Sequence, residues 1–465
     1  MNMLQQAHEL KHDTQCSHFH KKDRKGCSKP EAPGLASGGC TFEGAYFSLA
    51  PCADALHLVH GPATCAGLIW ETRHVKTSYK GRDYTKMGFS TDIDERQVVY
   101  GGDKGLAASI DYAINQYHPN AVFVYETCVT ALIGDDMDAV CASAEEAHGI
   151  PVIPIHAPGF AGNKNLGGRI GLDTVIKHLA GTMEPEESSP YDINLIGEYN
   201  ITGEMWHYTP LLEELGIRIL ASFSGDGRVQ RMRQAHRAKL NVVVCAKSVE
   251  AVCQHMEEKW GIPYISASFY GMRDASDSIR RICAALNDPE LMERAEKLIE
   301  REERKANALL KPYRTKFSGR KAVLNTGGNK AWSIASALQD IGLNVVATSV
   351  RKSGEDDKEK IRKIFGPDII MMEKPAAEQI AVLRNTGADI LLAGGRSLYA
   401  ALKRKVSFID VNQEKHETYC GYTGLINLAK DVDAALSNPM FGLVSKTAPW
   451  ANRTNEDEVR KAANG

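Results

Sequence analysis

The chain has 465 residues, which is too long for a single hydrophobic core and predicts two or three domains. Hydrophobic residues make up 43% and charged residues 25%, as in ordinary globular proteins, and the net charge of -2 argues against a nucleic-acid or anionic-membrane partner. The segment from Met1 to Asp13 has no apolar signal sequence and no run approaches a transmembrane helix, so we expect a cytoplasmic protein.

The first 40 residues predict an extended arm. They are polar, include a His- and Lys-rich stretch from His18 to Lys25, and continue into Pro/Gly-rich spacing. From about Ala45, short β-rich runs alternate with helical segments. Strands are predicted at Ala121–Tyr125, followed by a Cys128 loop and a helix from about Asp135, and at 152–155, followed by a glycine-rich loop and another helix.

A polar, Pro-containing stretch from Glu184 to Tyr191 predicts a linker, after which the alternation resumes. A long charged helix is predicted from Pro289 to Leu310, because its Glu, Arg and Lys residues are spaced for i,i+4 pairs. A third cycle starts at Lys321. The strands predicted in these cycles are 194–197, 218–221, 241–244, 264–266, 322–325, 344–348 and 389–392, with helices near 205–215 and from 331.

Three cycles of strand, loop and helix predict an α/β protein of three doubly wound (Rossmann-like) parallel-sheet domains with an N-terminal arm. In such sheets, ligands bind at the carboxyl ends of the strands, where Cys128, Cys245 and the loops 326–328 and 394–396 fall. The predicted boundaries are an arm at 1–44, domains at 45–190, 191–318 and 319–440, and a tail at 441–465.

The 11 cysteines are many for a cytosolic chain, and no CxxC motif points to zinc. Cys141, Cys253 and Cys283 fall in helix-like segments and are predicted to be core residues, while Cys52 is left open.

Cys40, Cys65 and Cys128 are different, because each is predicted to lie on a loop that can approach a cluster, Cys40 after a glycine pair and Cys65 after His60-Gly61-Pro62. Iron–sulfur clusters are held by thiolates, and three thiolates are one short of a simple four-iron set, so a partner subunit would supply the rest. The alternative is three buried cysteines without a metal function.

Several polar residues are candidates for contact with an anionic cluster or organic acid. For any single cation the alternative is a surface ion pair, and His57 and His60 are expected to be structural within the Cys65 loop. The candidates are Arg73, Lys164, Arg169, Lys330 and Arg396, with Asn412 as a polar neighbour.

Motifs along nearly the whole chain resemble the nitrogenase component-1-like family, and within it the NifE-type cofactor-assembly scaffold. The chain is also similar, more distantly, to the α subunit of molybdenum nitrogenase. The motifs are 16–18 with 26–30, 38–40, 57–62, 129–136, 194–200, 268–271, 393–396 and 410–414.

The resemblance implies an α2β2 complex with a homologous β-type subunit, NifN- or NifK-like. Cys40, Cys65 and Cys128 would hold a 4Fe-4S or P-cluster-like cluster at the α/β boundary. Cys245 would hold one end of a large iron–sulfur–carbide cofactor or precursor of the 8Fe type, with or without molybdenum and homocitrate. An ATP-dependent, NifH-like iron protein would supply electrons, and no Walker A sequence is present in this chain. The cofactor-binding residues expected on this basis are Cys245, Cys420, Arg73, Asn412, Lys164 and Arg396.

Two positions depart from the family pattern. Cys420 aligns with the histidine that ligates the cofactor in catalytic nitrogenase, where scaffolds carry a small non-ligating residue. A thiolate there suits iron and would retain the cluster, whereas a free cysteine is also a good apolar filler, and both interpretations stay open. Gly168 replaces a histidine used in substrate reduction, so dinitrogen reduction is not expected.

The leading hypothesis is a scaffold on which a cofactor precursor matures. The alternative is the catalytic subunit of a nitrogenase-like reductase, such as a methylthio-alkane reductase that cleaves C–S bonds and keeps its cluster through Cys245 and Cys420. The sequence does not decide whether the chain is an enzyme, and it predicts no catalytic residue.

Overall fold

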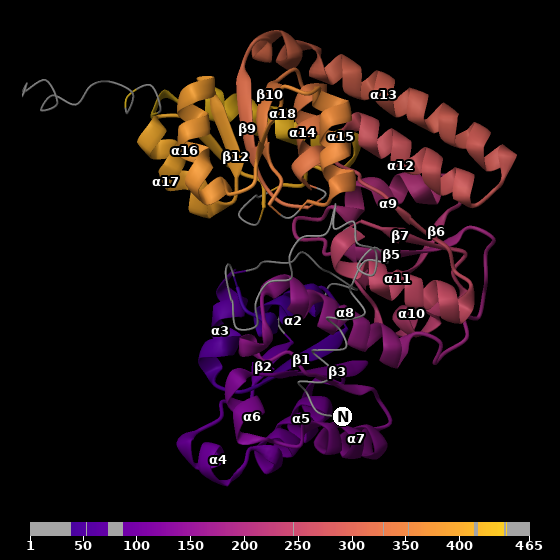
Figure 1. The fold of residues 1–465 in the computed structure, drawn as a ribbon. Coiled ribbons are helices and arrows are strands. Elements are labelled where there is room, and N and C mark those ends of the chain that lie inside the picture. Colours follow the sequence, from indigo (N-terminus) through magenta and orange to yellow (C-terminus); the bar gives the residue numbers. More distant parts are fainter. Residues whose placement is uncertain are drawn as a thin grey trace, which may run out of the picture.

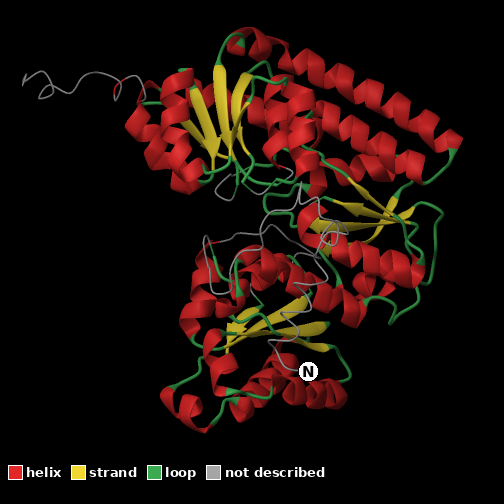
Figure 2. Ribbon diagram, in the orientation of Figure 1, coloured by secondary structure: helices red, strands yellow, loops and turns green. Residues whose placement is uncertain are grey.

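Three separate parallel β-sheets, each flanked by helices, make up the computed structural model (Figures 1 and 2). The structure describes residues 39–52, 54–72, 87–244, 246–328, 330–351, 353–412, 417–440 and 443. Within these residues no helix is long and apolar enough to cross a membrane. The three parallel sheets with flanking helices confirm the predicted α/β fold class.

The first sheet has the strand order β2-β1-β3-β4. Every residue of β1 and β3 is buried, because helices cover both faces of a parallel sheet. Its strands are β1 (Ala55–His60), β2 (Gly88–Ser90), β3 (Ala121–Glu126) and β4 (Val152–Ile155). Its helices are α2 (Thr41–Leu49), α3 (Ala63–Thr72), α4 (Glu95–Tyr100), α5 (Asp103–Tyr117), α6 (Cys128–Ile133), α7 (Met137–His148), η2 (Gly159–Ala161) and α8 (Lys164–Leu179).

The second sheet has the order β6-β5-β7-β8. Its strands are β5 (Asp192–Glu198), β6 (Arg218–Ser224), β7 (Leu240–Val243) and β8 (Tyr264–Ser266). The associated helices are α9 (Met205–Glu214), α10 (Val229–Gln234), η3 (Ala235–Arg237), α11 (Ala246–Trp260), α12 (Met272–Ala285) and α13 (Pro289–Phe317).

The third sheet has the order β11-β10-β9-β12-β13, so the chain reverses its winding direction between β9 and β12. Its strands are β9 (Lys321–Asn325), β10 (Asn344–Ser349), β11 (Ile370–Met372), β12 (Ile390–Ala393) and β13 (Ser407–Asp410). Its helices are α14 (Lys330–Asp340), α15 (Glu355–Phe365), α16 (Pro375–Thr386), η4 (Gly395–Ser397), α17 (Leu398–Arg404) and α18 (Gly421–Ser437).

Hydrophobic cores cross from one sheet to the next. One continuous core joins the second and third sheets through α12, α13, α14 and α18, and another joins the first and second sheets through α2, α8 and α11. The relative positions of the sheets are therefore fixed by apolar packing, which is the dominant favourable contribution to folding.

Several predicted details need correction. The α13 helix continues to Phe317 instead of ending near Leu310, and it does so with Pro312 inside it. Helix α2 begins at Thr41, within the segment predicted as the arm. His57 and His60 lie on β1 and not on a loop, because this strand is buried on both faces and has no apolar/polar alternation to reveal it.

Candidate functional site

Three thiols gather at the carboxyl edge of the first sheet. Cys65 lies in the first turn of α3, just after β1, and Cys128 begins α6, just after β3. Cys40 is the N-cap of α2 and forms an isolated antiparallel bridge with Asn163, the N-cap of α8. The sequence placed all three cysteines on loops, which is wrong for Cys65 and Cys128, because both lie in the first turn of a helix. Cys40 precedes its helix as the N-cap.

Gly159 shows how close the thiols lie. A Cβ atom built on Gly159 would be 2.9 Å from the Cys128 Sγ and 3.3 Å from the Cys40 Sγ. Both sulfurs therefore lie against the bare backbone of this glycine, at the start of η2. The pKa of Cys65 is influenced by the charges of Cys128 and Cys40, so the third thiol faces the same region.

Exposure separates these cysteines from the others. Cys40, Cys65 and Cys128 are partly exposed, whereas the other described cysteines are buried: Cys52, Cys141, Cys253, Cys283 and Cys420. The predicted core role of Cys141, Cys253 and Cys283 thus agrees with their burial. Cys52, left open by the sequence, contacts the Met232 sulfur at 3.8 Å and is a core residue as well.

The thiols lie in surroundings where their ionised forms are unfavourable unless a cation is bound nearby. Burial raises the pKa of Cys40 and of Cys65, and neighbouring thiolate charge raises both further, whereas the backbone N–H of Glu43 donates to the Cys40 Sγ at 3.5 Å and lowers the Cys40 value. Helix N-termini also favour thiolates. Bound iron would offset the remaining cost of ionising the thiols.

The donor set fits an iron–sulfur cluster better than a single ion. In the part of the chain that the structure describes, no three His, Cys, Asp or Glu side chains are placed to hold one metal ion. A cluster is larger than an ion and its thiolate ligands stand correspondingly further apart. Because Gly159 has no Cβ, its backbone lies directly next to the Cys40 and Cys128 sulfurs, in space that any side chain would fill.

Lys164 lies beside Cys40. Its ammonium group pairs with the Glu43 carboxylate at 3.0 Å and lies 4.8 Å from the centre of the Phe47 ring. The Phe47 ring in turn contacts the Tyr199 ring, 5.2 Å away, at the end of the second sheet. Lys164 thus links the thiol site to the boundary between the first and second sheets.

Two histidines near this edge are structural, as expected. His57 contacts the Tyr125 hydroxyl and the Cys52 carbonyl, and burial lowers its pKa to about 4. His60 pairs with Asp135 at 2.9 Å beneath α6.

His156 was not singled out from the sequence. It follows β4 and contacts Glu126 at 3.3 Å and Asp138 at 2.8 Å. Burial alone would lower its pKa, but the hydrogen bonds and charges of the two carboxylates raise it to about 9. The available signal was its position directly after a predicted strand, the same criterion that identified Cys128.

The second predicted site is described only in part. Cys245 and Arg73 lie outside the described residues, between β7 and α11 and after α3 respectively. Cys420 is the N-cap of α18, is 2% exposed, and forms an isolated bridge with Tyr270. Burial first, and then the charge of Cys420 and a hydrogen bond to it, raise the pKa of Tyr270.

Two buried carboxylates act on the same tyrosines as Cys420. The Tyr208 hydroxyl donates to Glu198 at 3.3 Å, while Glu204 accepts from both the backbone and the hydroxyl of Thr202. Both carboxylates are buried, and beyond the effect of burial their charges and that of Cys420 raise the pKa of Tyr208 and of Tyr270. Cys420 itself belongs to the apolar core that joins the second and third sheets.

The remaining candidates lie at the edge of the third sheet. Asn412 packs on Gly394, where a Cβ would meet the Asn412 Nδ2 at 2.8 Å, and Arg396 lies exposed on η4 beside it. The Thr326 Oγ1, directly after β9, is buried and has no hydrogen-bond partner among the residues that the structure describes. The structure places Asn412 and Arg396 at the same edge of the third sheet, whereas Lys164 begins α8 beside the first sheet.

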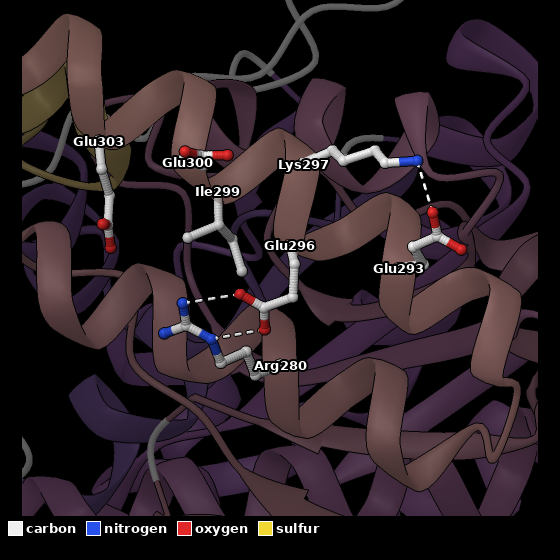
Figure 3. A pocket seen from close by; sticks show the side chains of 7 residues that line it. All are labelled: Arg280, Glu293, Glu296, Lys297, Ile299, Glu300 and Glu303. Atoms are coloured by element: carbon white, nitrogen blue, oxygen red, sulfur yellow. Dashed lines mark hydrogen bonds and ion pairs between the residues drawn. The ribbon is translucent and has the colours of Figure 1, made fainter.

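A surface pocket lies away from the cysteines, on α12 and α13. A pocket of about 320 Å³ between α12 and α13 is lined mainly by charged side chains, and its Arg280–Glu296 and Lys297–Glu293 pairs are drawn in Figure 3. These charged groups form ion pairs with one another, and no cysteine lines the pocket, so it is separate from the thiol sites.

The family model for nitrogenase component 1 type oxidoreductases matches residues 40–437. The chain is 50% identical to the nitrogenase iron-molybdenum cofactor biosynthesis protein NifE of Nostoc sp., covering 97% of this chain and 94% of that protein. It is 44% identical to NifE of Klebsiella pneumoniae, covering 94% and 97% respectively.

The solved structure of nitrogenase Cp1 at pH 6.5 is similar as well, with a TM-score of 0.82 and 25% identity over 92% of this chain and 93% of that one. The chain therefore belongs to the nitrogenase component 1 type oxidoreductase family, as a NifE-type member.

Proposed function

We propose that this chain is the α-type subunit of a cytoplasmic complex on which a large iron–sulfur precursor matures into nitrogenase cofactor. The observation that carries the proposal is the gathering of three partly exposed thiols at the carboxyl edge of the first sheet, where Cys40 and Cys128 lie against Gly159 and their charges act on Cys65. A relative that shares 50% identity is named as a nitrogenase cofactor biosynthesis protein, which supports the proposal. The reductase alternative has no such support.

In this proposal Cys40, Cys65 and Cys128 hold an interface cluster that a homologous, NifN-like subunit completes in an α2β2 heterotetramer. Their partial exposure supports this, because a site supplied entirely by one chain would be enclosed by it. Lys164, which pairs with Glu43, acts on this site by fixing the position of α2 beside α8.

An iron protein would dock next to these thiols. Val99 and Tyr100 on α4 and Leu132 on α6 are exposed large hydrophobic residues. The two helices are in contact, and α6 begins at Cys128. Exposed apolar side chains next to a redox site support a transient electron-donor partner there.

The second site would hold the precursor itself. Cys245 is the proposed ligand at one end and Cys420 at the other, with Arg73, Asn412 and Arg396 as polar neighbours. A side-chain hydrogen bond joins Tyr270 and Cys420, and with Cys420 as a thiolate the Tyr270 hydroxyl would be the donor. Such a bond withdraws charge from a thiolate, so Cys420 would be a weak ligand that can release its cargo.

Anaerobic cluster transfer tests the function. The purified complex, loaded with cluster, is mixed with cofactor-free nitrogenase, and the appearance of nitrogenase activity is followed together with loss of iron from the complex. We expect transfer. A complex that keeps its iron and instead reduces a substrate of its own would refute the scaffold.

Cys420→Ala tests the second ligand. With Cys245 intact, we expect iron to be retained, the electron paramagnetic resonance spectrum to change, and transfer to become faster. A spectrum and a transfer rate identical to those of the wild type would show that Cys420 is only a packing residue. Cys283→Ala, a buried cysteine on α12, controls for loss of packing.

A further inference from the structure

Gly159 lies against two of the three thiols and leaves no room for a side chain of its own. A Cβ on this residue would lie 2.9 Å from the Cys128 Sγ, 3.3 Å from the Cys40 Sγ and 3.3 Å from the Cys40 Cβ. Real Cβ atoms essentially never come within 3.0 Å of another heavy atom. Any side chain at this position must therefore displace a sulfur or move the backbone.

The backbone around Gly159 is held in place. Gly159 is buried, and the N–H of Ala161 donates to the Pro158 carbonyl at 2.9 Å, which closes the turn. Further along the same loop, Asn163 forms a backbone bridge with Cys40. The loop after β4 is thus tied to the residue whose thiol it contacts.

The backbone of Cys128 is held as well. The Thr127 hydroxyl donates to the His60 carbonyl at 2.9 Å, and the Thr127 N–H donates to the Thr130 hydroxyl at 3.1 Å. Cys128 follows directly and begins α6. Because both backbones are fixed by hydrogen bonds, a side chain at position 159 would act mainly on the sulfurs.

Gly162, in the same loop, offers a direct comparison. A Cβ there would be equally close, 2.9 Å, to the Leu166 Cδ2, which is the far end of a flexible side chain. Neither glycine adopts the left-handed backbone that alanine would strain, since Gly162 is extended with a φ of 163° and Gly159 lies in η2. The two positions therefore differ in what an added methyl group would meet.

We propose, building on the proposed function, that Gly159 is a positioning residue of the interface cluster. Its missing side chain lets the Cys40 and Cys128 sulfurs lie against one stretch of backbone and reach the same cluster. Relaxing the 2.9 Å contact to an ordinary one of 3.4 Å would shift a sulfur by about 0.5 Å. Metal–ligand distances tolerate only about 0.2 Å.

The test compares Gly159→Ala and Gly162→Ala with the wild type, each purified anaerobically in the full complex. On the loaded complexes, iron release to a ferrous chelator and the paramagnetic spectrum after reduction by dithionite are measured. On the cluster-free complexes, the Tm is measured, and alkylation of each cysteine by iodoacetamide is followed by mass spectrometry.

We expect Gly159→Ala to release iron at least about tenfold faster than the wild type and to change the spectrum, whereas Gly162→Ala should resemble the wild type. Without cluster, alkylation of Cys40 and Cys128 should change severalfold relative to Cys65 in Gly159→Ala alone. In a Cys128→Ala background, Gly159→Ala should lower the Tm less, because the clashing sulfur is absent.

Iron release and spectra unchanged in Gly159→Ala would overturn the proposal. Equal iron losses in Gly159→Ala and Gly162→Ala would do so too, because they would indicate general packing of the loop. The alkylation and Tm measurements use no cluster and measure no transfer. A wild-type complex that binds no cluster, with the alkylation difference intact, would therefore refute the scaffold role and still support the control of the sulfurs by Gly159.

Discussion

The contact between α2 and α8 is backbone against backbone, and adding one methyl group tests its role. A Cβ on Gly167 would lie 1.7 Å from the Thr41 carbonyl oxygen, where real Cβ contacts are essentially never under 3.0 Å. Neither atom belongs to a flexible side chain. Gly167→Ala therefore forces the two helices about 1.3 Å apart.

This separation affects the thiols because Thr41 follows Cys40 directly. Overpacking of this kind destabilises a protein by about 1–3 kcal/mol, and the Tm falls by a few degrees for each kcal/mol. Metal–ligand distances tolerate only about 0.2 Å. We therefore expect Gly167→Ala to lose much of its interface iron even where the complex still folds.

Iron analysis and thermal unfolding of the anaerobically purified complex provide the assay. Gly168→Ala is the matched control, since its Cβ would meet only the Gly44 oxygen at 3.7 Å and the Ser48 Cβ at 3.8 Å. These are ordinary contacts, and alanine is a better helix former than glycine, so Gly168→Ala should be neutral or stabilising. Equal iron content and Tm in the two variants would refute the reasoning.

Three other predictions follow from the structure. Burial, followed by the charge of Asp340, raises the pKa of Asp274 to about 8, so the stability that its protonated form contributes is lost as the pH rises through 8. Tm measurements should show Asp274→Asn resisting this loss between pH 5 and 8, and parallel curves would contradict it. The pKa of His156 is raised from 6.5 to about 9, so the stability from its ion pairs with Glu126 and Asp138 is lost as the pH rises between these values. His156→Gln should abolish the corresponding fall in Tm between pH 6.5 and 9. Cys65→Ser should lose interface iron, whereas Cys141→Ser, in the core, should lower the Tm and keep the iron; iron loss from both would remove the distinction.

The sequence predicted the sheets well where strands were apolar and bounded by turn residues. β4 occupies the predicted residues, and β5 and β7 differ from prediction by one or two residues at each end. β1 was missed because its two histidines interrupt the apolar run, although both are buried in the sheet. β1 forms because tertiary contacts bury all its residues, and a local sequence pattern does not show such contacts.

The thiol site was predicted in its residues but not in its geometry. The position of Cys128 after a predicted strand correctly indicated the carboxyl edge of the sheet. The sequence did not show that α3 and α6 begin directly after β1 and β3, which puts Cys65 and Cys128 in the first turns of these helices. His156 was beyond sequence reasoning in a different way. Its raised pKa depends on Glu126 and Asp138, which lie on other elements.

Helix α2 sets the distance between Cys40 and the second sheet. Cys40 caps its N-terminus, and Phe47, two turns later, meets Tyr199 at the second sheet. The rise of about 1.5 Å per residue makes this helix a spacer of fixed length between Cys40 and the boundary with the second sheet. Inserting one residue would both lengthen it and rotate its far end by about 100°. The distance from Cys40 to the second sheet is therefore set by one short helix and not by the loops around it.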